Sequence, residues 1–192
     1  ITPEIFWAKL NEGSGSTWTS TVGPNGTNTS AWSTSTQSGS GASLLFTGTT
    51  NSYNGGTTSS VDYGSAATIT VCAWIRPAST NGTKIVLESS TLSFDNAAWE
   101  ILFDSNTFGA LMGRGTGSQY RYMTCVPPPV NTWTHVAVVF DRSSTSGSIT
   151  IYLNGVSQSL STVNSNIGAS GTFANFTLFT GCRAGNANFY DG

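Results

Sequence analysis

Acidic side chains are the first candidates for chemistry in this sequence, because two carboxyl groups flanking a glycosidic bond can hydrolyse it. Such groups lie roughly 5 to 10 Å apart, which on a β-strand means acids at i and i+2 or i+4. Of the nine acids, Glu100 and Asp104 come closest to this spacing. Residue 102 between them is Leu, so no third acid completes the pattern. The pair is more typical of a solvated or ladder-capping pair than of a catalytic dyad.

Other catalytic sets are also poorly supported by the sequence. His135 is the only histidine and lies within an apolar alternating strand, which is unsuited to a hydrolase triad or a zinc site. The glycine-rich segment 113–117 follows a strand without opening a helix, so it favours a hairpin tip over a phosphate cradle. We therefore predict that the chain is not an enzyme.

Aromatic residues in polar surroundings offer a different chemistry, which is sugar binding. A pyranose presents an apolar C–H face and a rim of hydroxyls, so one or two exposed rings with polar side chains nearby suffice. Tyr120 and Tyr122 with Gln119 and Arg114 nearby form the best cluster, and Trp99 completes the predicted ligand-binding set. Arg121 should face the opposite side from the tyrosines. Cross-strand aromatic packing between sheets is the alternative. Further aromatics in polar surroundings are Trp18, Trp32, Tyr53, Tyr63 and Tyr190.

Isolated oxygen donors leave calcium as a possible ligand, although no cofactor is required. Hard cations are bound by carboxylates, amides and backbone carbonyls in loops. The candidates are Asp62, Asp95, Asn96 and Asp191, each alone in a turn, and Asp191 is the predicted metal ligand. An Asx-turn residue that bonds its own backbone is the alternative for each.

The stretch 131–155 positions these groups and is the clearest element of the chain. Val136, Val138 and Phe140 alternate with less apolar positions, and Ile149 and Ile151 repeat the pattern after a polar turn. A period of two in such residues predicts strands. The dipeptide at 154–155 is Asn-Gly, which favours a two-residue hairpin turn, so a three-stranded antiparallel meander is expected.

Further strands are expected around the meander. They span 5–10, 43–46, 69–75, 84–88, 99–103, 108–112, 120–125 and 176–179. The 69–75 strand is apolar on both faces, which predicts an interior position and a buried Cys72. The polar segment 11–40 predicts a long ordered loop. No helix of useful length is expected.

Composition limits the partners. Charged residues are 8% of the chain and the seven basic ones are scattered, which gives no footprint for nucleic acid. No apolar run approaches the roughly 20 residues of a membrane span, so membrane insertion is not expected. Position 1 is Ile rather than Met, which indicates a processed chain or a piece of a longer one. Both fit a secreted or surface-exposed protein. Three cysteines allow at most one internal bridge, and Cys125 and Cys182 are the candidates.

The segments 133–136 (WTHV), Asp141 and 151–155 (IYLNG) resemble the most recognisable pattern of laminin G-like domains in the concanavalin A-like superfamily. The resemblance implies an all-β fold, an antiparallel two-sheet β-sandwich of the concanavalin A-like jelly-roll type. It implies that residues 1–192 form one such domain, with Trp7 packing in its core.

The resemblance extends outward over most of the chain, through 10–15, 42–48 and 68–77. It also fails in two places. Where the family commonly carries an acidic calcium ligand, 19–23 has no carboxylate. The family's last strand, which follows a glycine like Gly192, is missing here.

Two functions are therefore expected. The first is a non-catalytic extracellular carbohydrate-binding or adhesion module whose partner is a polysaccharide or glycan. The alternative is a structural subunit of an extracellular or viral assembly, whose open sheet edge pairs with neighbouring subunits.

Overall fold

The computed structural model describes residues 5–27, 29–49, 54–55, 61–90, 99–113, 119–167, 170–183 and 187–192, with the backbone alone for 54, 55, 165 and 166. The strands are β1 (Trp7–Ala8), β2 (Thr17–Trp18), β3 (Ser20–Val22), β4 (Gly26–Thr27), β5 (Ala31–Ser33), β6 (Ser43–Leu45), β7 (Asn54–Gly55), β8 (Thr68–Ile75), β9 (Lys84–Ser90), β10 (Trp99–Asp104), β11 (Thr107–Gly113), β12 (Tyr120–Cys125), β13 (Thr134–Asp141), β14 (Ser148–Leu153), β15 (Val156–Ser157), β16 (Ser161–Asn166) and β17 (Thr177–Thr180). The predicted all-β fold is confirmed. Within the described ranges, no helix is long and apolar enough to cross a membrane.

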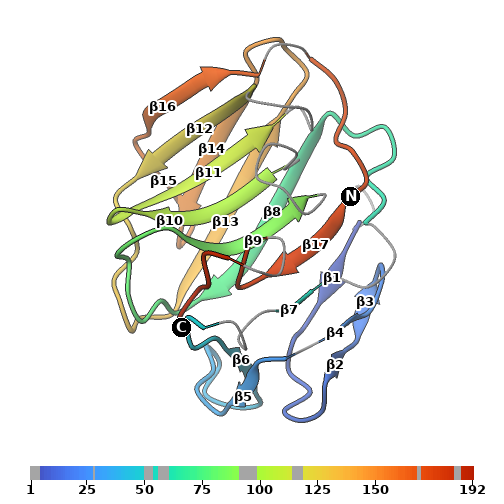
Figure 1. Cartoon of the computed structure of the whole chain (residues 1–192), viewed down its shortest axis with the longest axis vertical. Helices are drawn as coiled ribbons and strands as arrows, with labels where there is room; N and C mark the ends of the chain where they lie inside the picture. The colour runs from blue at the N-terminus through green and yellow to red at the C-terminus, as the bar shows by residue number, and fades with distance from the viewer. Residues whose placement is uncertain are drawn as a thin grey trace.

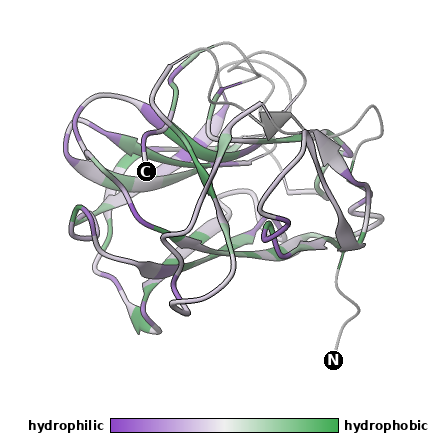
Figure 2. Cartoon of the chain, turned by 90° about the horizontal axis from the view of Figure 1, so that it is seen from below, coloured by the Kyte–Doolittle hydropathy of each residue, from purple (hydrophilic) through white to green (hydrophobic). Residues whose placement is uncertain are grey.

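Two antiparallel sheets form the body of the protein. A seven-stranded sheet has the order β16-β12-β11-β10-β9-β17-β7, and a four-stranded sheet has the order β15-β14-β13-β8. Seen edge-on, the two sheets lie one above the other as layers (Figure 2). Three two-stranded sheets, β1-β3, β2-β4 and β5-β6, gather at one end of the sandwich (Figure 1).

The predicted meander is confirmed and forms most of the four-stranded sheet. β13 pairs with β14 from Val136↔Leu153 to Asp141↔Ser148, and β15 returns beside β14. Asn154 and Gly155 have φ angles of 50° and 79°, which is the backbone that a two-residue hairpin turn requires at both central positions.

The core lies between the inner faces of the two sheets. Alternate residues of the long strands point into it, because successive side chains of a strand face opposite sides. Its buried members include Ile69, Ile75, Trp99, Ile101, Phe103, Phe108, Ala110, Met112, Val136, Val138, Phe140, Ile149 and Ile151. The alternation predicted for β10, β11 and β13 is therefore confirmed.

The 69–75 strand is placed differently from the prediction. β8 is the last strand of the four-stranded sheet and is paired to β13 alone in the described structure. On one face of β8 the side chains of Ile69 and Ile75 are buried, and on the other face Cys72 and Trp74 are exposed. The predictions that this strand is an interior strand and that Cys72 is buried are thus wrong. Apolar residues on both faces of a strand do not determine whether a second layer covers both faces.

The N-terminal third also departs from the prediction. Residues 11–40 contain the short strands β2 to β5 rather than one long loop. Trp18 is buried and packs edge-on against Phe6, with ring centroids 5.6 Å apart. Trp7 was expected in the core but is 45% exposed. Trp18, which was expected in polar surroundings, is therefore a packing residue, whereas Trp7 in the small β1-β3 sheet faces outward.

The cysteines are free. Cys125 and Cys182 are both buried, and neither is disulfide-bonded. The candidate bridge between them is not formed. His135 lies on the outer face of the four-stranded sheet and packs edge-on against Trp74, with ring centroids 5.2 Å apart.

Candidate functional site

The outer face of the seven-stranded sheet carries a second apolar cluster, separate from the core. Tyr122 of β12 lies opposite Leu111 of β11, and Leu102 of β10 lies opposite Ile85 of β9. These four side chains are buried together, and Tyr120 packs against them. Directly paired residues of antiparallel strands share a face, which is how strands distant in sequence build this cluster.

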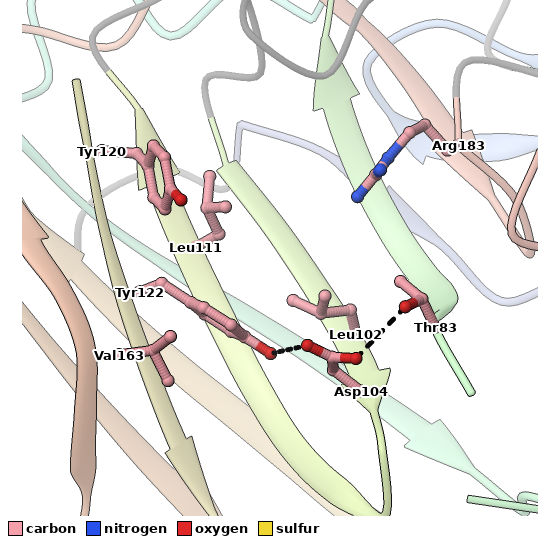
Figure 3. A pocket seen from close by; sticks show the side chains of 8 residues that line it. All are labelled: Thr83, Leu102, Asp104, Leu111, Tyr120, Tyr122, Val163 and Arg183. Carbon is pink, nitrogen blue, oxygen red and sulfur yellow. Dashed lines mark hydrogen bonds between the residues drawn. The ribbon is translucent and has the colours of Figure 1, made fainter. Parts of the chain in front are cut away.

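A groove with a volume of about 300 Å³ opens on this cluster. Its lining residues are Thr83, Leu102, Asp104, Leu111, Tyr120, Tyr122, Val163 and Arg183. Figure 3 shows Leu111 beside Tyr120, the hydroxyl of Tyr122 directed at Asp104, and Leu102 and Thr83 near the same carboxylate. We call it the tyrosine groove. Its apolar floor and polar rim match the two kinds of surface that a sugar ring presents.

Asp104 is the central polar group of the groove. Its Oδ1 accepts hydrogen bonds from the hydroxyls of Thr83 at 3.1 Å and Ser105 at 3.2 Å. Its Oδ2 accepts from the Tyr122 hydroxyl at 3.4 Å (Figure 3). Burial raises the pKa of Tyr122, and the charge of Asp104 raises it further. Tyr122 therefore stays protonated and donates to the carboxylate.

Gly109 of β11 makes room for the Tyr122 ring. A Cβ atom at this glycine would lie 2.7 Å from Cε2 of Tyr122 and 2.9 Å from the carbonyl oxygen of Met123. Both distances are shorter than normal contacts, and the backbone oxygen cannot swing aside. The ring of Tyr122 thus lies over β11 because residue 109 has no side chain.

Replacing Gly109 with alanine is expected to lower the free energy of unfolding by about 1–3 kcal/mol, since it overpacks a filled position. Urea unfolding measures the change. Gly171→Ala is the matched control, because a Cβ at Gly171 meets nothing within 4 Å. That variant should stay within about 0.5 kcal/mol of the wild type. Equal stabilities of the two variants would contradict the close approach of Tyr122.

Beside the groove, two glutamates and an arginine form a buried ionic cluster. Glu88 of β9 and Glu100 of β10 lie directly opposite each other, and both are fully buried. Nη2 of Arg183 lies 3.1 Å from Oε2 of Glu100, and its Nε lies 4.0 Å from Oε2 of Glu88. Burial raises the pKa of Glu100 well above its ordinary value, the charge of Arg183 lowers it in part, and Glu88 raises it again.

The structure places part of the predicted ligand-binding set together. Tyr120 and Tyr122 line one groove, and Gln119 is the half-buried residue next to them in sequence. Arg121 faces the other side, as predicted, where its Nη1 donates to the carbonyl oxygen of Ser146 at 3.3 Å. Arg114 lies outside the described residues.

Trp99 does not belong to the groove, which corrects the predicted set. Its side chain is on the inner face of β10, 3% exposed, and its Nε1 donates to the Tyr63 hydroxyl at 3.0 Å. In the register, Trp99 pairs with Met112, a core residue, whereas Tyr122 pairs with Leu111 on the opposite face. A buried ring of this kind holds the sheets together and cannot stack on a ligand.

The remaining candidate aromatics also divide by burial. Trp18, Tyr63 and Tyr190 are buried, so they serve packing. Trp32 is half-buried, and its Nε1 donates to the carbonyl oxygen of Gly15 at 3.0 Å. Tyr53 lies outside the described residues.

The candidate calcium ligands do not gather into a site. Oδ1 of Asp191 lies 2.6 Å from Nζ of Lys84, so an ammonium group stands where a cation would bind that oxygen. Asp62 accepts from the Gly64 amide and from Nδ2 of Asn175, both at 2.8 Å, as the Asx-turn alternative expects. Asp95 and Asn96 lie outside the described residues. No group of three or more acidic, histidine or cysteine residues suited to a metal occurs in the ranges that the structure covers. In the described residues Asp191 and Asp62 thus serve an ion pair and an Asx turn, and calcium binding stays a prediction.

Several groove residues were missed by sequence reasoning. Thr83, Leu102, Leu111, Val163 and Arg183 come from separate strands and loops, and no local pattern connects them. Asp104 had a usable signal, because it shares a strand face with Leu102 at i and i+2. Its spacing from Glu100 instead suggested a solvated or ladder-capping pair, with a catalytic dyad as the less favoured alternative.

An antiparallel β-sandwich with a polar-rimmed groove on its larger sheet is the class that this fold and site define. The chain belongs to the concanavalin A-like lectin/glucanase superfamily, whose laminin G family model matches residues 50–192. The resemblance seen in the sequence is thereby confirmed. No curated protein matches the chain.

Solved structures agree with this assignment. The chain is similar to the native heptameric SAP-like pentraxin from Limulus polyphemus, at 19% identity and a TM-score of 0.53 over 72% of this chain and 63% of that one. Domains LG4-5 of the mouse laminin alpha1 chain match at 12% identity and a TM-score of 0.51, over 72% and 34%. The binding domain of botulinum neurotoxin DC, in complex with SialylT, matches at 13% identity and a TM-score of 0.61, over 92% and 43%. The chain thus spans less than two thirds of each of these chains, and the likeness establishes the fold alone.

Proposed function

We propose that this chain is a non-catalytic, lectin-like module that binds a glycan in the tyrosine groove and acts outside the cell. The observation that carries the proposal is the groove itself, where the partly exposed Tyr120 lies beside an apolar floor that includes Tyr122, next to Asp104. The superfamily is named for lectins and glucanases, and the similar toxin domain was solved in complex with SialylT, which supports a carbohydrate as partner.

The arrangement of the acids supports a binding role rather than hydrolysis. Glu100 shares its strand face with Asp104 but is fully buried beneath Arg183, so it cannot flank a sugar bond in this conformation. The opposed Glu88 is equally buried. A glycosidase needs both carboxyl groups at the bond that is cleaved.

The proposal is tested by measuring binding of the protein to a broad glycan array and its retardation in affinity electrophoresis through gels that contain neutral polysaccharides. Tyr120→Ala should weaken binding about tenfold, because a ring that covers a sugar contributes more than about 1 kcal/mol. Tyr152→Ala is the matched control, since Tyr152 lies on the other sheet, in β14. Retention of no glycan by the wild type, or equal binding by the Tyr120 variant, would contradict the proposal.

A structural subunit is the second candidate, and the edge of β8 favours it. The Arg142 amide donates to the Ala67 carbonyl at 2.8 Å, which fixes the alternation of bonded pairs along β8 and β13. It follows that alternate β8 residues direct their backbone N–H and C=O groups away from β13. These residues are Thr68, Thr70, Cys72 and Trp74.

In the described structure no strand pairs with this side of β8, and exposed edges of this kind accept a strand from another chain. Concentration-dependent association in analytical ultracentrifugation, abolished by Thr70→Lys at the edge, would favour the structural role. A monomer that binds glycan would favour the lectin-like role.

A further inference from the structure

The two charged residues that line the tyrosine groove, Asp104 and Arg183, differ in how far the protein already compensates their charge. Asp104 lies at its rim, and the one described arginine that lines it, Arg183, is in contact with Glu100 and near Glu88. Two carboxyl groups thus face the guanidinium from beneath. An ionised Glu88 or Glu100 thus offsets the positive charge of Arg183, whereas Asp104 has no ion-pair partner among the described residues.

Arg183 is therefore a poor receptor for an anionic ligand. Its Nη2 already donates to Oε2 of Glu100 at 3.1 Å, and both glutamates are fully buried and cannot move into solvent. An arginine binds a carboxylate best through a bidentate pair of N–H donors, and here part of that fork is used within the protein.

Asp104 in contrast retains capacity to accept hydrogen bonds. An ionised carboxylate has about four acceptor positions on its two oxygens. Oδ1 accepts from Thr83 and Ser105, whereas Oδ2 accepts the long 3.4 Å hydrogen bond from the Tyr122 hydroxyl. Strong O–H···O⁻ bonds are about 2.5–2.7 Å long, so a sugar hydroxyl at Oδ2 would make a better bond than Tyr122 does.

Building on the proposed function, we infer that the tyrosine groove selects neutral glycans, whose hydroxyls donate to Asp104, and rejects glycans that carry a carboxylate at the same position. A sialic acid or uronic acid residue there would bring a like charge against Asp104, and Arg183, the described cation of the groove, is already paired with Glu100. Like charges set against each other at an interface weaken binding strongly.

The test uses matched pairs on one array, in which each neutral oligosaccharide is printed beside its sialylated form and each neutral hexose polymer beside its uronic acid form. The wild type should bind the neutral member at least about tenfold more tightly. Asp104→Asn should weaken binding of the neutral glycans about tenfold and reduce the difference in affinity between the neutral and the acidic member of each pair.

Two variants control for charge and for folding. Asp141→Asn removes a carboxylate from β13 of the other sheet and should leave the preference unchanged. Thr83→Val removes a hydrogen bond to Asp104 but leaves its charge, so the preference for neutral glycans should persist even if the affinity falls. Thermal unfolding checks that each variant is folded.

The possible results separate the two proposals. A preference of the wild type for the acidic members, or an unchanged preference in Asp104→Asn, would overturn the inference and leave the lectin-like function standing. Binding to neither member of any pair would contradict the lectin-like function, and the inference would fall with it.

Discussion

Replacing Trp99 with alanine is expected to lower the free energy of unfolding by about 3–5 kcal/mol. Trp99 is 3% exposed and packs against Phe140 of the opposite sheet, with ring centroids 5.8 Å apart. Its loss would leave a cavity between the layers. It would also remove the 3.0 Å hydrogen bond that Nε1 of Trp99 donates to the buried Tyr63 hydroxyl, which adds to the loss of stability. Urea unfolding followed by circular dichroism measures the change.

Trp74→Ala is the matched control for this variant. Trp74 is 47% exposed and contacts His135 edge-on, so its removal should cost no more than about 1.5 kcal/mol. Trp99→Ala that remains folded at low temperature should bind glycan as the wild type does. If it kept full stability but lost glycan binding, Trp99 would be a ligand residue after all.

Replacing Arg183 with methionine is expected to lower the free energy of unfolding by about 3–5 kcal/mol above pH 8, where Glu100 is ionised in the wild type. Removal of one partner leaves Glu88 and Glu100 buried without their guanidinium, and an uncompensated buried charge costs far more than the pair contributes. The triple variant Arg183→Met, Glu88→Gln, Glu100→Gln removes the charges together. It should recover most of the lost stability, which a simple packing defect would not.

The same variant should show a distinctive pH dependence. Burial already raises the pKa of Glu100 in the folded protein above its ordinary value of 4.5, and loss of the arginine raises it further. A carboxyl group with a raised folded pKa binds its proton more tightly in the folded state, so stability falls as pH rises from about 4.5 towards the raised pKa. The deficit of Arg183→Met should therefore be smallest near pH 5, where Glu100 is protonated in both folded proteins, and should grow as pH rises through about 8, the pKa of Glu100 when its arginine is present. A deficit independent of pH would contradict the buried ionic cluster.

The sequence alone predicted the strands and much of their facing. The alternation of apolar residues with a period of two predicted β10 to β14, and the dipeptide Asn154-Gly155 predicted the hairpin between β14 and β15. Both signals depend on neighbouring residues only. The alternation of Tyr120 and Tyr122 with Arg121 was confirmed for the same reason. The motifs at 133–155 also identified the superfamily.

Alternation did not reveal which side of a strand meets the core, and this is where the site prediction went wrong. Trp99 and Tyr122 lie on strands two apart in the sheet, and the register decides that they face opposite sides. Register depends on hydrogen bonds between strands and on the order of strands in the sheet. A local sequence pattern predicts neither of these. For the same reason the sequence did not predict that β8, although apolar on both faces, is an edge strand in the described structure.

The sequence by itself determined a two-layer β-sandwich of a recognisable superfamily with two tyrosines on one strand face. Only the tertiary structure decided that Asp104, Thr83 and Arg183 join those tyrosines in a groove, and that Glu88 and Glu100 meet beneath Arg183. Arg183 and Glu100 are 83 positions apart in the chain. Contacts over such separations form when strands pair and sheets pack, so their physical cause is the folded arrangement and no spacing in the sequence can predict them.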